Sequence, residues 1–291
     1  MSAVPPTATA IDIDHLREWV GRQQIAEQRI DPFPARALAG LLDRAQAPEA
    51  GDALPLPWHW LYFLDTPARA AIGIDGHPGR GGFLPPVPLP RRMWASGEID
   101  VEAPLTIGRD AQKVSTVQSV ELKQGQSGAL VFVTVEHVLS QAGRTCLRER
   151  QHIVYRDAPI GAAPLPPGSP PKDEARWQRA LQPDPAMLFR YSALTYNGHR
   201  IHYDRDYATR QEFYPALVVH GPLLATLLLD LLQTERPESP IAHFDFRALR
   251  PAFDADLLTL QGRAGDDGRS ARLWTVDPQG AQGMGANVRF A

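Results

Sequence analysis

Cysteine and lysine are scarce in this sequence, and both shortages narrow the range of functions. The one cysteine, Cys146, excludes an internal disulfide and a cysteine-rich metal site. Three of the 30 basic residues are lysines (Lys113, Lys123 and Lys172), so arginine supplies almost all of the positive charge. Codon bias is sufficient to explain this preference, and binding of phosphate or carboxylate groups by guanidinium forks is the alternative.

A strong net charge and a membrane-length apolar run are also missing. The formal net charge is −3, which gives no electrostatic case for a nucleic-acid partner or a membrane surface. The opening residues, MSAVPPTATAID, have neither a basic start nor a long apolar stretch, so we expect no secretion signal and a cytoplasmic location. The 291 residues allow one large or two ordinary domains.

The most apolar stretch runs from Leu223 to Leu232 and contains only Thr226 and Asp230 as polar residues. A helix that is apolar around most of its girth must be enclosed by protein. Pro222 stands at its first position, where a missing N–H costs least. At about 1.5 Å per residue this helix is too short to span a bilayer. We therefore expect a buried central helix.

The segment before this helix changes character twice. Met187–Thr195 is apolar and is interpreted as a strand, which ends in the polar run from Tyr196 to Arg200. Asp204 then has the position of an N-cap for a short helix.

The first half of the chain is predicted to contain helices over 12–28 and 35–45 and a strand or short helix over 55–65. Residues 76–92 hold five prolines and lack the Walker and dinucleotide spacings, so we expect a loop packed over a pocket. Alternating apolar residues then predict strands over 92–101, 112–123, 129–140 and 145–155.

The second half repeats this order. Residues 157–173 contain six prolines and are interpreted as a linker. A turn of helix is expected over 177–182. Strands are predicted after the central helix over 241–249, 256–264, 271–277 and 284–290.

The segments Asn197-Gly198-His199-Arg200-Ile201-His202 and His220-Gly221 carry a family resemblance. Their spacing is similar to the Asp-x-Asn-Pro-(Ile/Leu)-His motif and the His-Gly pair of MaoC-like hydratases and dehydratases. HRIHYDRDYA, YPALVVHGPLLA and, more weakly, GHPGRGGFLPPVPLPRRMW resemble a sub-branch with 3-hydroxyacyl-thioester dehydratases and mesaconyl-C4-CoA and itaconyl-CoA hydratases.

The resemblance implies an α+β double hot-dog fold, in which two antiparallel sheets each wrap a central helix. Residues 1–156 would form an N-terminal unit that walls the acyl pocket, and 157–173 would be the linker. Residues 174–291 would form the unit that carries the catalytic motif. A homodimer is also compatible with this resemblance.

Hydration of an enoyl thioester needs a base for water, an acid for Cα and donors for the enolate-like oxygen. By the resemblance, His202 is the catalytic histidine and the Gly221 N–H is the donor at the positive end of the central helix. The acyl-CoA is itself the substrate, so no cofactor is expected. His199 and His202 have no clear third ligand, and we expect no metal.

Asn197 stands where the family has an aspartate. Asparagine can orient water but takes no proton at neutral pH. Acid and base work then falls to His202, with help from Tyr196, His199 or Asp204, although Asp204 is better explained as a helix cap.

Other residues near the motif are candidates for substrate binding. His220 is expected to pack and hydrogen-bond near the helix start, next to Val219. Arg200 and Arg205 are ordinary surface charges in one interpretation, and partners of a substrate carboxylate or CoA phosphate in the other.

The sub-branch implies reversible hydration of a short branched dicarboxylic enoyl-CoA, itaconyl-CoA or mesaconyl-C4-CoA, to citramalyl-CoA. The carbon that receives hydroxide then bears a carboxylate, and burial of an unpaired carboxylate is costly. A dehydratase of straight-chain (R)-3-hydroxyacyl thioesters and a non-catalytic thioester-binding module remain alternatives. A thioesterase is disfavoured because Asp230 lies deep in the predicted helix.

Overall fold

The computed structural model describes residues 11–125, 128–159 and 161–291. The opening segment, on which the expectation of no secretion signal rests, lies mostly outside these residues. Among the described residues, no helix has both the length and the apolar character needed to cross a membrane.

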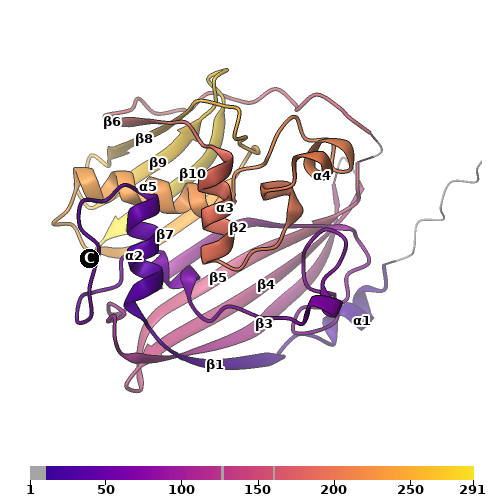
Figure 1. The fold of residues 1–291 in the computed structure, drawn as a ribbon, viewed down its shortest axis with the longest axis horizontal. Helices are drawn as coiled ribbons and strands as arrows, with labels where there is room; N and C mark the ends of the chain where they lie inside the picture. The colour runs from indigo at the N-terminus through magenta and orange to yellow at the C-terminus, as the bar shows by residue number, and fades with distance from the viewer. Residues whose placement is uncertain (1–10, 126–127, 160) are drawn as a thin grey trace, which may run out of the picture.

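Helices and strands follow one another in a partly repeated order along the chain (Figure 1). The helices are α1 (Ile13–Arg17), α2 (Pro32–Leu41), α3 (Pro185–Leu194), α4 (Arg205–Arg210) and α5 (Gly221–Glu235). The strands are β1 (Gln23–Arg29), β2 (Arg91–Val101), β3 (Asp110–Gly125), β4 (Gly128–Gln141), β5 (Arg144–Arg156), β6 (Trp177–Leu181), β7 (Ile241–Ala248), β8 (Leu258–Ala264), β9 (Ser270–Val276) and β10 (Gln282–Phe290).

The strands form one antiparallel sheet in the order β1-β3-β4-β5-β2-β7-β10-β9-β8-β6. The N-terminal half supplies the first five positions of this order and the C-terminal half the last five. The two groups meet where β2 pairs with β7, for example Gly97 with Phe246. The α+β hot-dog class is confirmed, and its two sets of strands are joined edge to edge into one sheet. The proposed domain boundaries stay a prediction.

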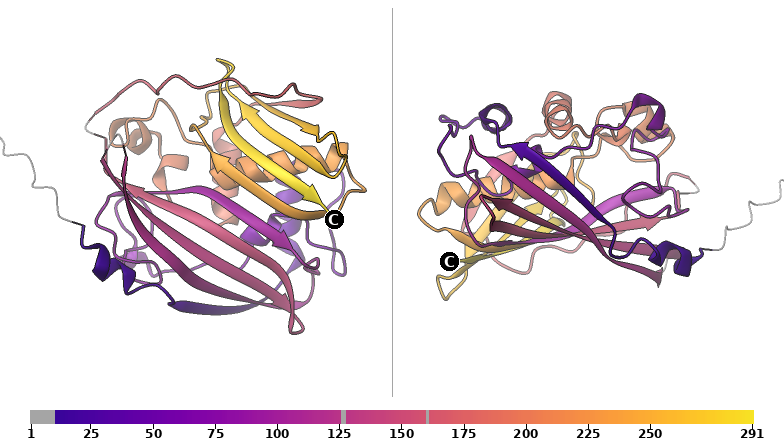
Figure 2. Two further views of the ribbon diagram at one scale, coloured as in Figure 1. Left: turned by 180° about the vertical axis from the view of Figure 1, so that it is seen from behind. Right: turned by 90° about the horizontal axis from the view of Figure 1, so that it is seen from below.

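Helix α5 is the buried axis that the sequence predicts. Every residue from Leu223 to Leu232 is buried, and the helix packs against β6, β8, β9 and β10. The corresponding helix of the first half, α2, packs against α3 and a 3₁₀ turn at Trp58–Leu61. Figure 2 shows these helices on one side of the sheet.

The strand predicted over 187–195 is wrong, because α3 occupies this segment. Asp184 caps the helix by accepting a hydrogen bond from the Met187 N–H at 2.8 Å, and Pro185 follows at the first position. The buried residues Leu188, Tyr191 and Ser192 have helical spacing. Asp184 and Pro185 form a helix start signal. This signal outweighs the apolar and aromatic residues that suggested a strand.

Two further helix predictions are wrong at the edges of the sheet. The helix expected over 12–28 ends at Arg17, and β1 follows and pairs with β3. Gly21 at φ +85° separates the two. The helical turn expected over 177–182 is the edge strand β6, which pairs with β8. Both segments are short and weakly patterned, so backbone pairing with a neighbouring strand decides their conformation.

The other predicted elements agree with the structure to within a few residues. The loop before β2 and the described part of 157–173 contain no regular helix or strand. The loop matters most for function, because it crosses from the N-terminal half to the motif of the C-terminal half.

Candidate active site

Four histidines form a row between the two halves. The ring centroids of His77 and His199 are 4.0 Å apart, those of His199 and His202 are 5.4 Å apart, and those of His202 and His220 are 3.7 Å apart. His77 belongs to the loop before β2, and His220 is the N-cap of α5. The row therefore leads from the N-terminal half to the mouth of the central helix.

His202 lies at the end of a 3₁₀ turn over Arg200–His202. Its Nδ1 is 2.7 Å from the carbonyl oxygen of Val218. A carbonyl only accepts, so Nδ1 carries the proton and Nε2 keeps its lone pair. Burial lowers the pKa of His202 to about 4. The side chain is thus a neutral base at physiological pH, with a fixed tautomer.

His220 stacks on His202 and is almost completely buried. Its Nε2 is hydrogen-bonded to Ser192 Oγ at 2.8 Å, and burial lowers its pKa well below the ordinary value. This position fits the expected packing role. Val219 is also buried, and its N–H donates to the carbonyl oxygen of Ala252.

Gly221 is the first residue of α5 and precedes Pro222. In the part of the chain that the structure describes, its N–H has no hydrogen-bond acceptor. The N-terminus of a helix carries about half a positive charge. This free amide, one residue from His220, is therefore a suitable donor for an oxyanion.

Asn197 is engaged in its own turn. Its Oδ1 accepts a hydrogen bond from the His199 N–H at 3.0 Å. This is a local side-chain turn, which shapes the backbone and holds the two motif residues together.

Asp75 and His77 complete the row, and the motif-based interpretation missed both. Asp75 Oδ2 is 3.0 Å from His77 Nδ1. The loop is seated on the motif, because a Cβ on Gly76 would lie 1.8 Å from the carbonyl oxygen of Gly198. The Arg200 N–H also donates to the Asp75 carbonyl oxygen at 2.9 Å. The run Asp75-Gly76-His77 in a glycine-rich loop is the sequence feature that could have pointed to these two residues.

The charges in this cluster are strongly perturbed. Burial would raise the pKa of Asp75, but hydrogen bonds from the His77 ring and N–H outweigh burial and hold this pKa below its ordinary range. Burial, with the neighbouring histidines, lowers the pKa of His199 to about 2. Burial also lowers the pKa of His77, against the Asp75 hydrogen bond. The histidines are therefore neutral beside one carboxylate.

Asp75, His77 and His199 bring their potential ligand atoms within 4.8 Å of one another. Two of these groups come from the N-terminal loop, so the trio differs from the His199 and His202 pair considered from the sequence. Because Asp75 is hydrogen-bonded to the His77 ring and the His77 and His199 rings are 4.0 Å apart, we interpret the three as an acid–base cluster.

Three of the proposed site residues point elsewhere. Tyr196 is 61% exposed at the end of α3. Arg200 pairs with Asp204 at 2.8 Å, and Asp204 caps α4 as predicted. Arg205 pairs with the buried Asp254 at 2.5 Å. In the structure these two arginines stabilise the fold around the motif.

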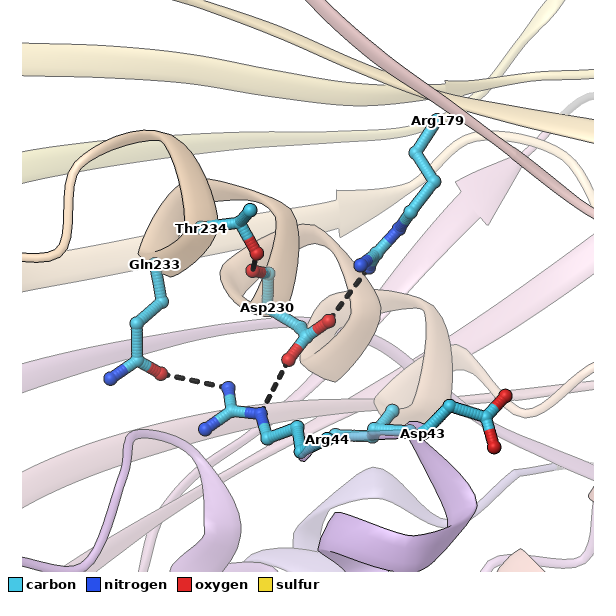
Figure 3. A pocket seen from close by; sticks show the side chains of 7 residues that line it. Asp43, Arg44, Arg179, Asp230, Gln233 and Thr234 are labelled. Atoms are coloured by element: carbon cyan, nitrogen blue, oxygen red, sulfur yellow. Dashed lines mark hydrogen bonds and ion pairs between the residues drawn. The ribbon is translucent and has the colours of Figure 1, made fainter. Parts of the chain in front are cut away.

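A pocket of about 230 Å³ lies toward the C-terminal end of α5, at Asp230. Figure 3 shows Asp230 between two guanidinium groups. Its carboxylate oxygens are 2.7 Å from Arg44 Nε and 2.8 Å from Arg179 Nη2. This acidic residue of the central helix is therefore part of an ion-pair network, as expected for a residue that does not act as a thioesterase acid.

Comparisons with known proteins identify the family of this chain. The family model for hydroxyacyl-thioester dehydratase type 2 matches residues 57–254. A mesaconyl-C(4)-CoA hydratase of Chloroflexus aurantiacus is 44% identical over 275 residues, covering 94% of this chain and 96% of the relative. The mitochondrial hydroxyacyl-thioester dehydratase type 2 of Schizosaccharomyces pombe is 28% identical over 67% of this chain and 73% of the relative. The crystal structure of HtdX from Mycobacterium tuberculosis covers 91% of this chain and 98% of its own, with a TM-score of 0.63 at 17% identity, which shows the fold.

Fold, site and relatives together define a hot-dog hydro-lyase of the MaoC-like hydratases and dehydratases. Within this class, the chain belongs to the hydroxyacyl-thioester dehydratase type 2 family.

Proposed function

We propose that this protein adds water reversibly to mesaconyl-C4-CoA to give citramalyl-CoA. The carrying observation is the neutral His202 next to the free Gly221 N–H at the mouth of α5. Support for the substrate comes from the 44% identical mesaconyl-C(4)-CoA hydratase, which aligns over nearly the whole chain. Itaconyl-CoA, with the same number of carbons, is a second candidate that also gives citramalyl-CoA, but its C=C bond joins Cβ to the terminal methylene, so hydration would protonate that methylene and not Cα.

The reaction uses His202 first as a base. Nε2 takes a proton from water while the water oxygen bonds to Cβ, and the electrons of the C=C bond move to the thioester oxygen. The Gly221 N–H and the helix N-terminus stabilise the resulting enolate. The His202 imidazolium then returns the proton to Cα, so that one water molecule is added in total.

The remaining residues prepare His202 for this task. His220 packs on one face of its ring, and His199 meets its edge. Asn197 holds the turn, and the Asp75–His77 pair supports His199 from the N-terminal half. CoA is part of the substrate, and the proposal needs no cofactor or metal. A homodimer stays a prediction.

The first test follows the loss of enoyl-thioester absorbance with crotonyl- and mesaconyl-C4-CoA, and the formation of citramalyl-CoA by mass spectrometry with itaconyl-CoA. Wild-type enzyme should act best on the two C5 substrates. The rate of His202→Ala should fall at least 100-fold, since general base catalysis typically contributes about 10²–10⁴-fold. His15→Ala, on the exposed helix α1, is the matched control. A His202→Ala rate above about a tenth of the wild-type rate would remove His202 from this role.

A dehydratase of straight-chain (R)-3-hydroxyacyl thioesters is the second candidate, because the family model and the Schizosaccharomyces pombe relative are named hydroxyacyl-thioester dehydratase type 2. It requires a long apolar acyl tunnel. The cavity beside His199 is lined by Arg91 and Arg92 together with polar side chains, and this charged lining favours a charged acyl group over a long apolar one. Activity on a C8 enoyl-CoA above that on the C5 substrates would reverse this preference.

A further inference from the structure

The substrate of the proposed function carries a free carboxylate at Cβ, and the arginines expected to bind it are already engaged. Arg200 pairs with Asp204, and Arg205 pairs with Asp254. Arg80, in the loop before β2, donates to the backbone carbonyl oxygens of Val87, Leu89 and Pro90. A different cation is needed near the histidine row.

Arg92, on β2, lies beside this row. It is half-buried and pairs across the strands with Tyr155 of β5. In residues 11–125, 128–159 and 161–291, Arg92 forms no ion pair with a carboxylate. Its positive charge reaches the cluster, since it adds to the effect of burial in lowering the pKa of His77 and of His199.

The two acidic residues that line a cavity with Arg92 are held by other donors. Arg92 lines a cavity of about 20 Å³ together with Asp75, His199 and Glu212. Glu212 accepts from Arg91 Nε at 2.5 Å. Asp75 accepts from the N–H and the ring of His77, both at 3.0 Å. Arg92 thus lines a narrow, partly buried site without an ion pair to either of these carboxylates.

The cavity has room for about one water molecule, which needs on the order of 10–15 Å³. A carboxylate is larger than a water molecule, so its binding requires the side chains around the cavity to move apart. A guanidinium can bind a carboxylate through two parallel hydrogen bonds, which fix both its position and its orientation.

We propose that Arg92 binds the free carboxylate of the substrate and makes the enzyme specific for dicarboxylic enoyl thioesters. The inference rests on the proposed function, because it assumes a carboxylate on the carbon that receives hydroxide. Held in this way, the carboxylate orients Cβ toward the water at His202. The N-terminal half therefore supplies specificity and the C-terminal half supplies catalysis.

The experiment compares two substrates that differ in one group. 3-Methylcrotonyl-CoA has a methyl group where mesaconyl-C4-CoA has the carboxylate, and the rest of the acyl group is the same. We expect Arg92→Met to lower the ratio of kcat/KM for mesaconyl-C4-CoA to that for 3-methylcrotonyl-CoA by about 100-fold, as for the loss of one partner of a buried charge pair. Arg92→Lys keeps the positive charge but loses the planar guanidinium group that can form two parallel hydrogen bonds. We expect it to lower the same ratio of kcat/KM values by about 10-fold. Arg210→Met, on the exposed face of α4, is the matched control.

Each outcome decides the matter. An unchanged ratio in both Arg92 variants overturns the inference and leaves the proposed function intact. Wild-type enzyme without activity on mesaconyl-C4-CoA overturns both. If Arg92→Met fails to fold, Arg92→Lys decides the test, with circular dichroism as the check on folding.

Discussion

At the scale of single residues, the functional groups have their properties because of burial and hydrogen bonding. His202 is a histidine like any other in the sequence. In the structure, a carbonyl fixes its tautomer, burial lowers its pKa to about 4, and His220 holds its ring. Two predictions follow from this local environment.

A proline at position 221 would remove the N–H of this residue. His220 has φ −61° and ψ 130°, a conformation that tolerates a following proline. We expect Gly221→Pro to lower kcat by about 10²–10³-fold, the usual effect of losing an oxyanion donor. Gly221→Ala is the control, because it keeps the N–H and its Cβ meets atoms no closer than 3.9 Å. Equal losses of kcat in the two variants would show that the space, not the amide, matters.

His77 should influence His202 through charge and through the packing of His199. When His77 is protonated at acidic pH, its positive charge lowers the pKa of His202, after the larger effect of burial. We therefore expect His77→Gln to move the acidic limb of kcat/KM to higher pH and to lower kcat by roughly 10-fold. If the role of His77 is purely structural, the acidic limb of kcat/KM should stay at the same pH. The pH profile therefore distinguishes the two roles. His15→Gln is the matched control.

At the scale of elements, α5 has different roles at its two ends. Its N-terminus faces the histidine row, and its C-terminal half places Asp230 between Arg44, after α2, and Arg179, on β6. The ion pairs join the central helix to both halves of the chain (Figure 3).

We therefore expect Asp230→Ala to lower the free energy of unfolding and to leave kcat almost unchanged. Removal of one partner from a buried ion pair typically costs about 3–5 kcal/mol, and the two arginines are only partly buried, so we expect about 3 kcal/mol or less. Urea unfolding measures this free energy, and kcat of the folded fraction should stay near the wild-type value. A large fall in kcat with unchanged stability would identify Asp230 as a catalytic acid. Asp206→Ala, whose ion pair on α4 is exposed, is the control.

At the scale of the whole molecule, the buried histidines connect stability to pH. The folded-state pKa values of His199 (about 2) and His202 (about 4) lie below the ordinary value of 6.5, and that of His220 is also lowered. Between the folded and unfolded pKa values, the unfolded chain binds more protons. Stability is therefore greatest above pH 6.5 and decreases as the pH falls toward 4, by up to about 1.4 kcal/mol per pH unit for each histidine.

Urea unfolding at pH 7.5, 6.0 and 5.0 tests this dependence. The free energy of unfolding of the wild type should decrease steadily below pH 6.5. His199→Gln removes one of the depressed groups, so its free energy should depend less steeply on pH, by about one proton at pH 5. Identical slopes in the two proteins would mean that His199 is accessible to protons in the folded state.

Elements with a strong local signal could be predicted from the amino-acid sequence. The apolar run of α5 with Pro222, the cap at Asp204 and the alternating strands were predictable from periodicity and capping. The motif also placed His202, His220 and Gly221 near one another, because only a short segment separates them. Weakly patterned segments such as β1, β6 and α3 were misassigned, since strand pairing or a single cap decides their conformation.

The residues that surround this motif could not be predicted, because they come together only when the chain folds. The Asp75–His77 pair and Arg92 are more than 100 residues from His202 in the chain, and no spacing rule connects them. The pairing of β2 with β7 and the tight seat of Gly76 on Gly198 bring them together. Whether an arginine binds substrate or stabilises the fold depends on which carboxylates lie next to it, and those neighbours exist only after the two halves have packed.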